Sequence, residues 1–248
     1  MGTFAVILPA AGKSSRFGDP TQKKIFADLE GRAVWLRAAE MFVARDDVAQ
    51  TIVAVAADDR ELFEQRYRPS VAFLNITVVE GGAERYDTIA RALGAVDPAC
   101  EFVAVHDAAR PCVSAELIDA VFAAAREFGA AIPGVPVADT VKRVDPASRH
   151  IVETVSRAGL VAVQTPQAFR RDLLVRAYAA RSAVAHATDD AQLVEALGHP
   201  VHVVDGSPYN LKITTAADLK IAAAFLQAMP KPKRDGPAHP FANERAMW

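Results

Sequence analysis

Residues 4–16 have the sequence FAVILPAAGKSSR, and this stretch decides which fold the chain can adopt. The apolar run from Phe4 to Leu8 predicts a buried first strand, and a loop of small residues with two cations follows it. Without bulky side chains in this loop, backbone N–H groups can approach a polyanion, while Lys13 and Arg16 add positive charge at the same place. The combination suits a nucleoside triphosphate.

The loop matches neither of the common phosphate-binding motifs. A Walker A loop needs G-x-x-x-x-G-K-[ST], and a dinucleotide-binding loop needs G-x-G-x-x-G; residues 8–16 contain neither. Small residues after a strand are also ordinary turn chemistry. By itself, this segment therefore leaves both a phosphate site and a plain turn open.

Composition limits the function classes that need consideration. The chain has 248 residues, 51% of them hydrophobic, so it can bury a sizeable core. A formal net charge of -2 argues against a nucleic-acid partner bound by bulk electrostatics. Cys100 and Cys112 are too few for a disulfide framework and lack zinc-site spacing. Without a secretory signal pattern or a run of about 18 apolar residues, we expect no membrane partner and a cytoplasmic location.

Short apolar runs alternate with longer helical patterns, which is typical of βαβ units. Several runs are apolar throughout, as in strands covered on both faces of a parallel sheet. We therefore expect an α/β fold with a Rossmann-like, mostly parallel twisted sheet flanked by helices. The expected strands are Phe4–Leu8, Thr51–Ala56, Ile76–Val79, Phe102–His106 and Ala130–Val135, and the expected helices between them are Ala33–Val43, Asp58–Tyr67, Glu84–Val96 and Ser114–Phe128.

Three loops follow strands of this expected sheet at the same end. They begin at Pro9, at Gly81-Gly82 and at His106-Asp107. Because ligands of open α/β sheets bind at the carboxyl ends of the strands, the three loops should meet at one binding edge.

Residues 136–159 interrupt the βα pattern with an inserted β-hairpin. Alternating stretches at 137–144 and 150–155 flank a turn that contains Asp145-Pro146. A protruding hairpin exposes its edges, and a second copy of the chain would cover them most economically. We expect one domain over residues 1–229, closed by helices near 170–181, 189–197 and 216–229 and a strand at 201–204. The proline-rich, charged tail 230–248 should be flexible.

Asp107 is the candidate metal ligand. A carboxylate at the end of a central strand can hold Mg²⁺ while phosphate oxygens complete the coordination shell. A helix cap or a surface pair with Arg110 would explain the same residue without a metal. His106 fits a packed, hydrogen-bonded residue better than a catalytic base, because no triad partner accompanies it.

Eight short segments, in this order and spacing, resemble the 2-C-methyl-D-erythritol 4-phosphate cytidylyltransferase family. The segments are PAAGKSSR (9–16), KIF (24–26), GGAER (81–85), HDAARP (106–111), DT (139–140), QTPQ (164–167), TDD (188–190) and NLKIT (210–214). The resemblance implies transfer of CMP from CTP to a polyol phosphate in non-mevalonate isoprenoid synthesis, with Mg²⁺ as cofactor and release of pyrophosphate.

The resemblance also implies a role for each matched residue. Arg16, Lys24 and Lys212 would be the catalytic cations, and Asp107 would hold Mg²⁺ beside the nucleotide. Nucleotide-binding residues would be Ala10, Ala11, Gly12, Lys13, Gly82, Arg85 and Thr88. The acceptor phosphate would meet Thr140, Arg157, Thr165 and Thr188, of which the first two reach the partner's site through the 136–159 arm of a homodimer.

The chain departs from the family pattern at several positions. Ser14 stands where glycine is usual, Ala83 replaces an acidic residue, and Thr88 replaces a serine. An apparent insertion before Lys24 makes Lys23 a second candidate for the active-site lysine. A ribitol-5-phosphate cytidylyltransferase, a guanylyl- or uridylyltransferase, and a nucleotide-binding module without turnover remain open.

Overall fold

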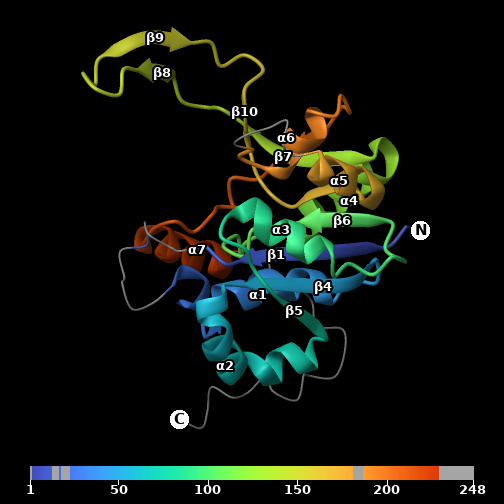
Figure 1. Ribbon diagram of the computed structural model, residues 1–248. Coiled ribbons are helices and arrows are strands. Elements are labelled where there is room, and N and C mark those ends of the chain that lie inside the picture. Colours follow the sequence, from blue (N-terminus) through green and yellow to red (C-terminus); the bar gives the residue numbers. More distant parts are fainter. Residues whose placement is uncertain (1, 13–16, 18–22, 181–186, 229–248) are drawn as a thin grey trace.

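A computed structural model describes residues 2–12, 17, 23–180 and 187–228. In this part of the chain, eight strands form one sheet, with a layer of helices on each face (Figure 1). Parallel pairing joins β1 (Phe4–Ala10) to both β4 (Val48–Val55) and β6 (Phe102–Val105), and β4 to β5 (Ile76–Glu80). The expected α/β fold with a mostly parallel sheet is therefore confirmed.

Beyond β6, the sheet continues through antiparallel pairing. Strand β11 (Gln167–Arg170) lies between β6 and β7 (Ala130–Pro136) and runs antiparallel to both. Farther along β7, β10 (Val161–Val163) pairs antiparallel and β12 (His202–Asp205) pairs parallel. Strands β10 and β11 were not predicted from the sequence, because three- and four-residue strands are too short to show a period.

Alternate residues of β1 enter two separate hydrophobic clusters, which explains why the strand is apolar throughout. Phe4, Val6 and Leu8 pack with α1 (Val34–Val43), α2 (Arg60–Phe73) and α4 (Ala115–Phe128). Ala5 and Ile7 pack with α3 (Arg85–Leu93), α5 (Arg171–Ala179) and α6 (Asp190–Glu195) on the other face. Successive strand side chains point to opposite faces, so a strand covered twice has no polar position.

Smaller elements complete the fold. A short hairpin of β2 (Asp28–Leu29) and β3 (Arg32–Ala33), which the sequence analysis missed, precedes α1. Helix α2 runs past the expected end at Tyr67 and includes Pro69. The 3-10 turns η1 (Lys24–Phe26) and η2 (Ala57–Asp59) precede β2 and α2. In the described residues, no helix is both long enough and apolar enough to cross a membrane.

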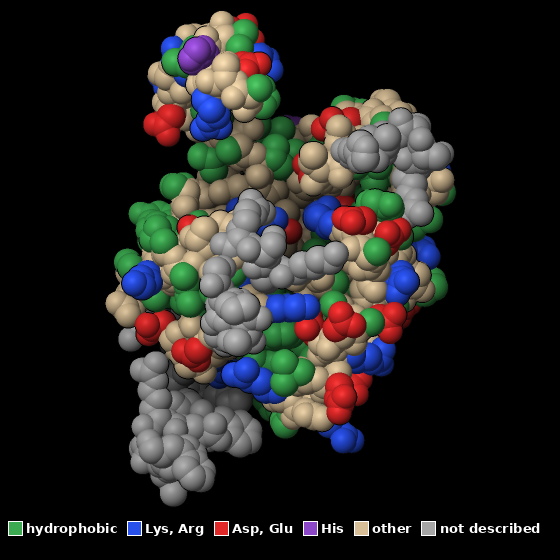
Figure 2. Space-filling view, turned by 60° about the vertical axis from the view of Figure 1, so that its left-hand side comes forward, with side chains coloured by type: hydrophobic (Ala, Val, Ile, Leu, Met, Phe, Trp, Pro, Cys, Tyr) green, Lys and Arg blue, Asp and Glu red, His purple; other side chains and the backbone are tan. Residues whose placement is uncertain are grey.

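The predicted hairpin is present and stands away from the body (Figures 1 and 2). Strands β8 (Val141–Val144) and β9 (Ile151–Val155) form their own two-stranded antiparallel sheet. Ile151 and Val152 are more than 60% exposed. Pairing of this arm with a second chain stays a prediction, and the tail 230–248 lies outside the described residues.

A capping box begins the last helix, α7 (Ala216–Ala228). Asp218 Oδ2 accepts hydrogen bonds from Thr214 N and Thr215 N at 2.8 Å and from Thr214 Oγ1 at 2.6 Å. Thr215 Oγ1 in return accepts from Asp218 N at 3.3 Å. Hydrogen bonding to Thr214 lowers the pKa of Asp218 to about 2.

Asp218→Ala is expected to lower the free energy of unfolding at pH 7 by about 1 kcal/mol, because a helix cap is lost. Since the folded-state pKa of Asp218 lies below its usual value near 3.8, its contribution is present above that value and disappears as the pH falls towards 2. Urea unfolding at pH 7 and pH 2.5 measures both effects. The matched control is Asp46→Ala, at an exposed carboxylate. Equal losses at the two pH values would contradict the prediction.

Candidate functional site

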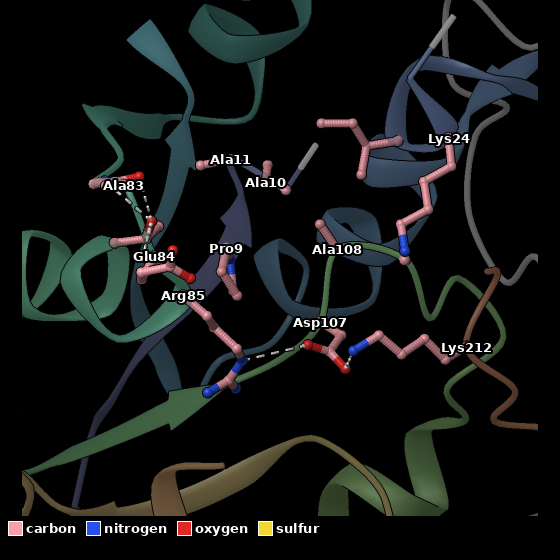
Figure 3. Close-up of a pocket in the computed structure, with 15 residues that line it drawn as sticks. Pro9, Ala10, Ala11, Lys24, Ala83, Glu84, Arg85, Asp107, Ala108 and Lys212 are labelled. Carbon is pink, nitrogen blue, oxygen red and sulfur yellow. Dashed lines mark hydrogen bonds and ion pairs between the residues drawn. The ribbon is translucent and has the colours of Figure 1, made fainter. Parts of the chain in front are cut away.

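A pocket of about 330 Å³ opens where the carboxyl ends of β1 and β6 meet the start of α3 (Figure 3). The three loops that were expected to meet at one edge all contribute to it. Fifteen described residues line the pocket: Pro9, Ala10, Ala11, Gly12, Lys24, Ile25, Gly82, Ala83, Glu84, Arg85, Thr88, Asp107, Ala108, Ala109 and Lys212. Nine of the predicted site residues are therefore brought together.

Glycine is required where the loop after β5 approaches the loop after β1. A Cβ atom at Gly81 would lie 2.5 Å from the Cβ of Ala11, and a Cβ at Gly82 would lie 2.3 Å from the Cβ of Asp87. A larger residue at position 81 would push the loops after β5 and β1 apart, and one at position 82 would push the turn away from Asp87 on α3. The small residues identified in the sequence thus allow one wall of the pocket to form from closely spaced backbone.

The hydroxyl of Thr88 holds this glycine turn in shape. Thr88 Oγ1 accepts a hydrogen bond from Gly82 N at 3.0 Å and donates to Glu84 O at 3.0 Å. Thr88 is buried and also lines the pocket. These two bonds use the donor position of the hydroxyl and one of its two acceptor positions.

Asp107 lines the pocket between Arg85 and Lys212 (Figure 3), and Arg110 is a third cation beside it. Its Oδ2 is 2.8 Å from Lys212 Nζ and 3.4 Å from Arg110 Nε, and its Oδ1 is 4.0 Å from Arg85 Nε. Burial alone would raise the pKa of this carboxyl, but Lys212, Arg85 and Arg110 together hold it well below its usual range. Asp107 is therefore ionised near neutral pH and pairs with these cations, of which Lys212 and Arg85 line the pocket. The pair with Arg110, considered from sequence as an alternative, is also present.

Arg85 joins this centre to a buried carboxylate behind it. Arg85 Nη2 lies 2.7 Å from Asp190 Oδ2, and Tyr178 donates a 2.5 Å hydrogen bond to Asp190 Oδ1. Burial alone would lower the pKa of Arg85, but the charges of Asp190 and Asp107 raise it above its usual value. Asp190 and Tyr178 were not predicted as site residues from the sequence; the signal for Asp190 was its place in the TDD segment at 188–190.

His106 is packed and hydrogen-bonded, as expected. Its Nε2 donates to Arg110 O at 3.0 Å, so the neutral ring accepts at Nδ1 from Thr165 Oγ1, 3.2 Å away. Burial lowers the pKa of His106 to about 4, which keeps the ring neutral. Thr165 Oγ1 also accepts from Asp107 N at 3.0 Å, so this predicted acceptor-binding residue lies behind Asp107 rather than in the pocket lining.

The structure separates the two candidate lysines. Lys24 lines the pocket, because buried Ile25 and Phe26 fix the 3-10 turn that carries it. Lys23 instead pairs with Asp59 at 2.6 Å, outside the lining. Of the two candidates, Lys24 is the one that lines the pocket.

Lys24→Ala is expected to lower kcat/KM for a nucleotide at least about 10-fold, because it removes a cation from the pocket. Lys23→Ala should leave kcat/KM within about 2-fold, because Lys23 lies outside the pocket lining. It should lower the free energy of unfolding by about 1–3 kcal/mol, because the buried carboxylate of Asp59 loses its partner. Steady-state kinetics and urea unfolding of the two variants give the comparison. A larger kinetic loss in Lys23→Ala would reverse the assignment.

The other predicted residues lie elsewhere. Thr140 and Arg157 are exposed at the base of the arm, where Arg157 Nη1 donates to Ala138 O. Thr188 is exposed before α6, and its N–H donates to Gln192 Oε1 at 2.9 Å. None of these three lines the pocket within the same chain. Lys13 and Arg16 lie outside the described residues.

Two carboxylates of the described residues line the pocket, those of Glu84 and Asp107. Among the described residues, no group of three or more His, Cys, Asp or Glu side chains could hold a metal. Mg²⁺ often uses one carboxylate together with substrate phosphates and water. Asp107 Oδ1 is 4.0 Å from Arg85 Nε, which is longer than a hydrogen bond. The donor set therefore fits a metal that arrives with a triphosphate and does not fit a metal held by protein alone.

Comparison with known proteins gives the same assignment. Residues 4–228 match the model of the 2-C-methyl-D-erythritol 4-phosphate cytidylyltransferase family. The enzyme of that name from Solibacter usitatus is 41% identical over 232 residues, covering 90% of this chain and 95% of the relative. The one from Frankia casuarinae is 46% identical over 223 residues, covering 90% and 80%.

Solved structures share the fold. The 2-C-methyl-D-erythritol 4-phosphate cytidylyltransferase of Thermus thermophilus is 37% identical with a TM-score of 0.73, covering 92% of this chain and 100% of the other. The 4-diphosphocytidyl-2C-methyl-D-erythritol synthase of Anaerococcus prevotii has a TM-score of 0.77 at 29% identity, covering 91% and 96%. The chain therefore belongs to the 2-C-methyl-D-erythritol 4-phosphate cytidylyltransferase family.

Proposed function

We propose that this chain transfers CMP from CTP to 2-C-methyl-D-erythritol 4-phosphate, with release of pyrophosphate, for isoprenoid precursor synthesis. The observation that carries the proposal is the Asp107–Lys212 pair in a pocket whose lining matches the family segments. The chain's own residues would bind and orient two anions whose mutual repulsion must be neutralised.

The reaction is an in-line substitution at phosphorus. An oxygen of the acceptor phosphate bonds to the α-phosphorus of CTP, while the bond from that phosphorus to the bridging β-phosphate oxygen breaks and pyrophosphate leaves. Lys212 and Lys24, which both line the pocket, would stabilise the charge that develops on the phosphate oxygens. Arg16, which follows β1 in the sequence, is expected to contribute further positive charge to this stabilisation. No covalent enzyme intermediate is needed.

Asp107 would hold Mg²⁺ through Oδ1, the oxygen that faces away from Lys212. When bound, the metal supplies positive charge to the triphosphate oxygens. Lys212 and Arg110 remain on Oδ2 and keep the carboxylate oriented.

The base would lie between the Ala10–Gly12 backbone and the Gly82–Thr88 turn. Both segments approach closely because their residues are small, and Thr88 Oγ1 has an acceptor position left for an amino group. Ala83 lines the pocket but has no polar side-chain group that could bind cytosine. Backbone groups would therefore supply most of the selectivity for this base. Lys13 is expected to add charge on the nucleotide side.

The acceptor phosphate would be bound by Thr140 and Arg157 from the arm of a second chain. An arginine fork with hydroxyl groups matches a phosphate monoester. Both residues are exposed and lie outside the pocket lining of their own chain, which agrees with delivery to a partner. Thr188 would lie nearby. The active form would then be a homodimer.

Mixing two inactive variants tests the shared site. In a dimer of Lys212→Ala and Arg157→Ala chains, one of the two sites contains both native residues if the arms cross. Random subunit exchange puts about half of the dimers in this form, so activity should return to about one quarter of the native value. Native mass spectrometry confirms the exchange. No recovery in exchanged dimers would place each site within one chain.

A pyrophosphate-release assay tests the reaction itself. CTP, UTP, GTP and ATP are each combined with 2-C-methyl-D-erythritol 4-phosphate or ribitol 5-phosphate, with Mg²⁺ or with a chelator. We expect release from CTP with the first acceptor, and only with the metal. Release with ribitol 5-phosphate alone would favour the ribitol enzyme, and release with another nucleotide would change the base assignment. No release in any combination, despite nucleotide binding, would indicate a binding module.

A further inference from the structure

Lys212 is carried by a segment without regular secondary structure. Residues 206–215 connect β12 to α7 and contain neither a strand nor a helix. No ladder of backbone hydrogen bonds therefore fixes the direction of the Lys212 side chain, and individual contacts must do so. Two buried residues flank it, Asn210 and Ile213.

The side-chain amide of Asn210 ties the segment to β10–β11. Asn210 Nδ2 donates to Thr165 O at 2.8 Å and to Gln164 Oε1 at 3.3 Å. Gln164 in turn accepts from Ser207 N at 3.2 Å and donates to Ser207 O at 2.8 Å. Asn210 Oδ1 is buried and has no hydrogen-bond partner in the part of the chain that the structure describes. The two amide hydrogens, rather than the oxygen, make this attachment.

The backbone of the same segment is bonded to the loop that carries Asp107. Arg110 Nη1 donates to Asn210 O at 2.7 Å, and Ile213 N donates to Ala109 O at 2.8 Å. Thr165, whose carbonyl accepts from Asn210, also binds Asp107 N through its hydroxyl. Asn210 therefore contacts two partners of Asp107: Arg110 through its backbone carbonyl and Thr165 through its side chain.

We propose that Asn210 is a positioning residue, which holds Lys212 Nζ 2.8 Å from Asp107 and directed into the pocket. Only an amide fits this place, because both hydrogens of Nδ2 face oxygen acceptors. An aspartate would put an oxygen against Thr165 O and Gln164 Oε1, and an alanine would leave both without this donor. The inference rests on the proposed function of Lys212 in CMP transfer.

Kinetics of Asn210→Ala and Asn210→Asp test the proposal with CTP, 2-C-methyl-D-erythritol 4-phosphate and Mg²⁺. We expect kcat to fall about 10- to 100-fold with a smaller change in KM for CTP, because a misplaced cation weakens the transition state more than substrate binding. Tyr209→Ala is the matched control: this neighbour is 52% exposed and its ring contacts Phe225, so kcat should stay within about 2-fold.

A double-mutant cycle separates positioning from general stability. If Asn210 acts through Lys212, adding Asn210→Ala to Lys212→Ala should lower kcat by less than about 2-fold further. A merely structural role would give the same fold loss in both backgrounds. Independent losses that multiply would overturn the proposal.

A readout without substrate covers the case in which the wild-type chain shows no transferase activity. Acetic anhydride labelling followed by mass spectrometry reports the accessibility of each lysine in the folded protein. In Asn210→Ala, Lys212 should react at least about 3-fold faster than in the wild type, because its ion pair with Asp107 loosens. Lys23, paired with Asp59, is the internal reference and should not change. An unchanged Lys212 rate overturns the positioning role, whereas an inactive wild type with a raised Lys212 rate overturns only the proposed function.

Discussion

Lys212→Ala is expected to lower kcat at least about 100-fold, with a smaller effect on KM for CTP. Lys212 is a preorganised cation: its Nζ is already 2.8 Å from Asp107, and its segment is fixed by buried contacts before substrate binds. Interactions of this kind act mainly on the charge that appears in the transition state. Steady-state kinetics with pyrophosphate detection measure kcat and KM separately.

The fold should survive this substitution, because Asp107 keeps Arg85 and Arg110 as partners. Lys220→Ala, at an exposed lysine on α7, is the matched control and should retain native kcat. A kcat of Lys212→Ala within about 2-fold of the native value would exclude the catalytic role.

Asp107→Asn should lower kcat/KM at least about 1,000-fold, the upper range for loss of one preorganised group, since two functions are lost together. The carboxylate proposed to bind Mg²⁺ becomes a neutral amide. Lys212, Arg85 and Arg110 also lose the negative charge that all three share. The amide has nearly the same volume, so the pocket shape changes little. Initial rates over a range of Mg²⁺ concentrations measure the loss and show whether excess metal restores any of it.

The control for lost charge alone is Asp47→Asn. Asp47 is also an ion-paired carboxylate, 2.9 Å from Arg45 and 2.8 Å from Arg126, but it lies outside the pocket lining. The substitution Asp47→Asn should lower the free energy of unfolding by about 1–3 kcal/mol without changing kcat/KM. If Asp107→Asn keeps native kcat/KM, the proposed metal role and the proposed alignment of the cations are both wrong.

The sequence predicted the parallel half of the sheet better than the antiparallel half. The strand from Phe4 is apolar at every position because two helical layers cover it, and this pattern is readable without coordinates. Strand β11 has four residues, and its place between β6 and β7 depends on pairing across distant parts of the chain. Local sequence contains no signal for such a pairing.

The same distinction applies to the site. Gly82 and Asp107 could be found because they stand in short segments directly after predicted strands, and Lys24 because its KIF segment resembles the family pattern. The attachment of Asn210 to Thr165, or of Arg85 to Asp190, joins residues 45 or 105 positions apart. Such contacts follow from the folded arrangement of several elements, so a pattern within one segment cannot indicate them.

The cluster around Asp107 has a consequence for how a highly charged ligand is admitted. Before a ligand binds, the Asp107 carboxylate pairs with the cationic groups of Lys212, Arg85 and Arg110. These side chains would otherwise sample many conformations in water, and the ion pairs hold them in place. An incoming polyphosphate would meet cations that are already in place, with Lys212 and Arg110 still paired to Asp107 Oδ2. Few side chains then have to change conformation on binding. Less of the binding free energy is lost in ordering them, and more of it can stabilise the transition state.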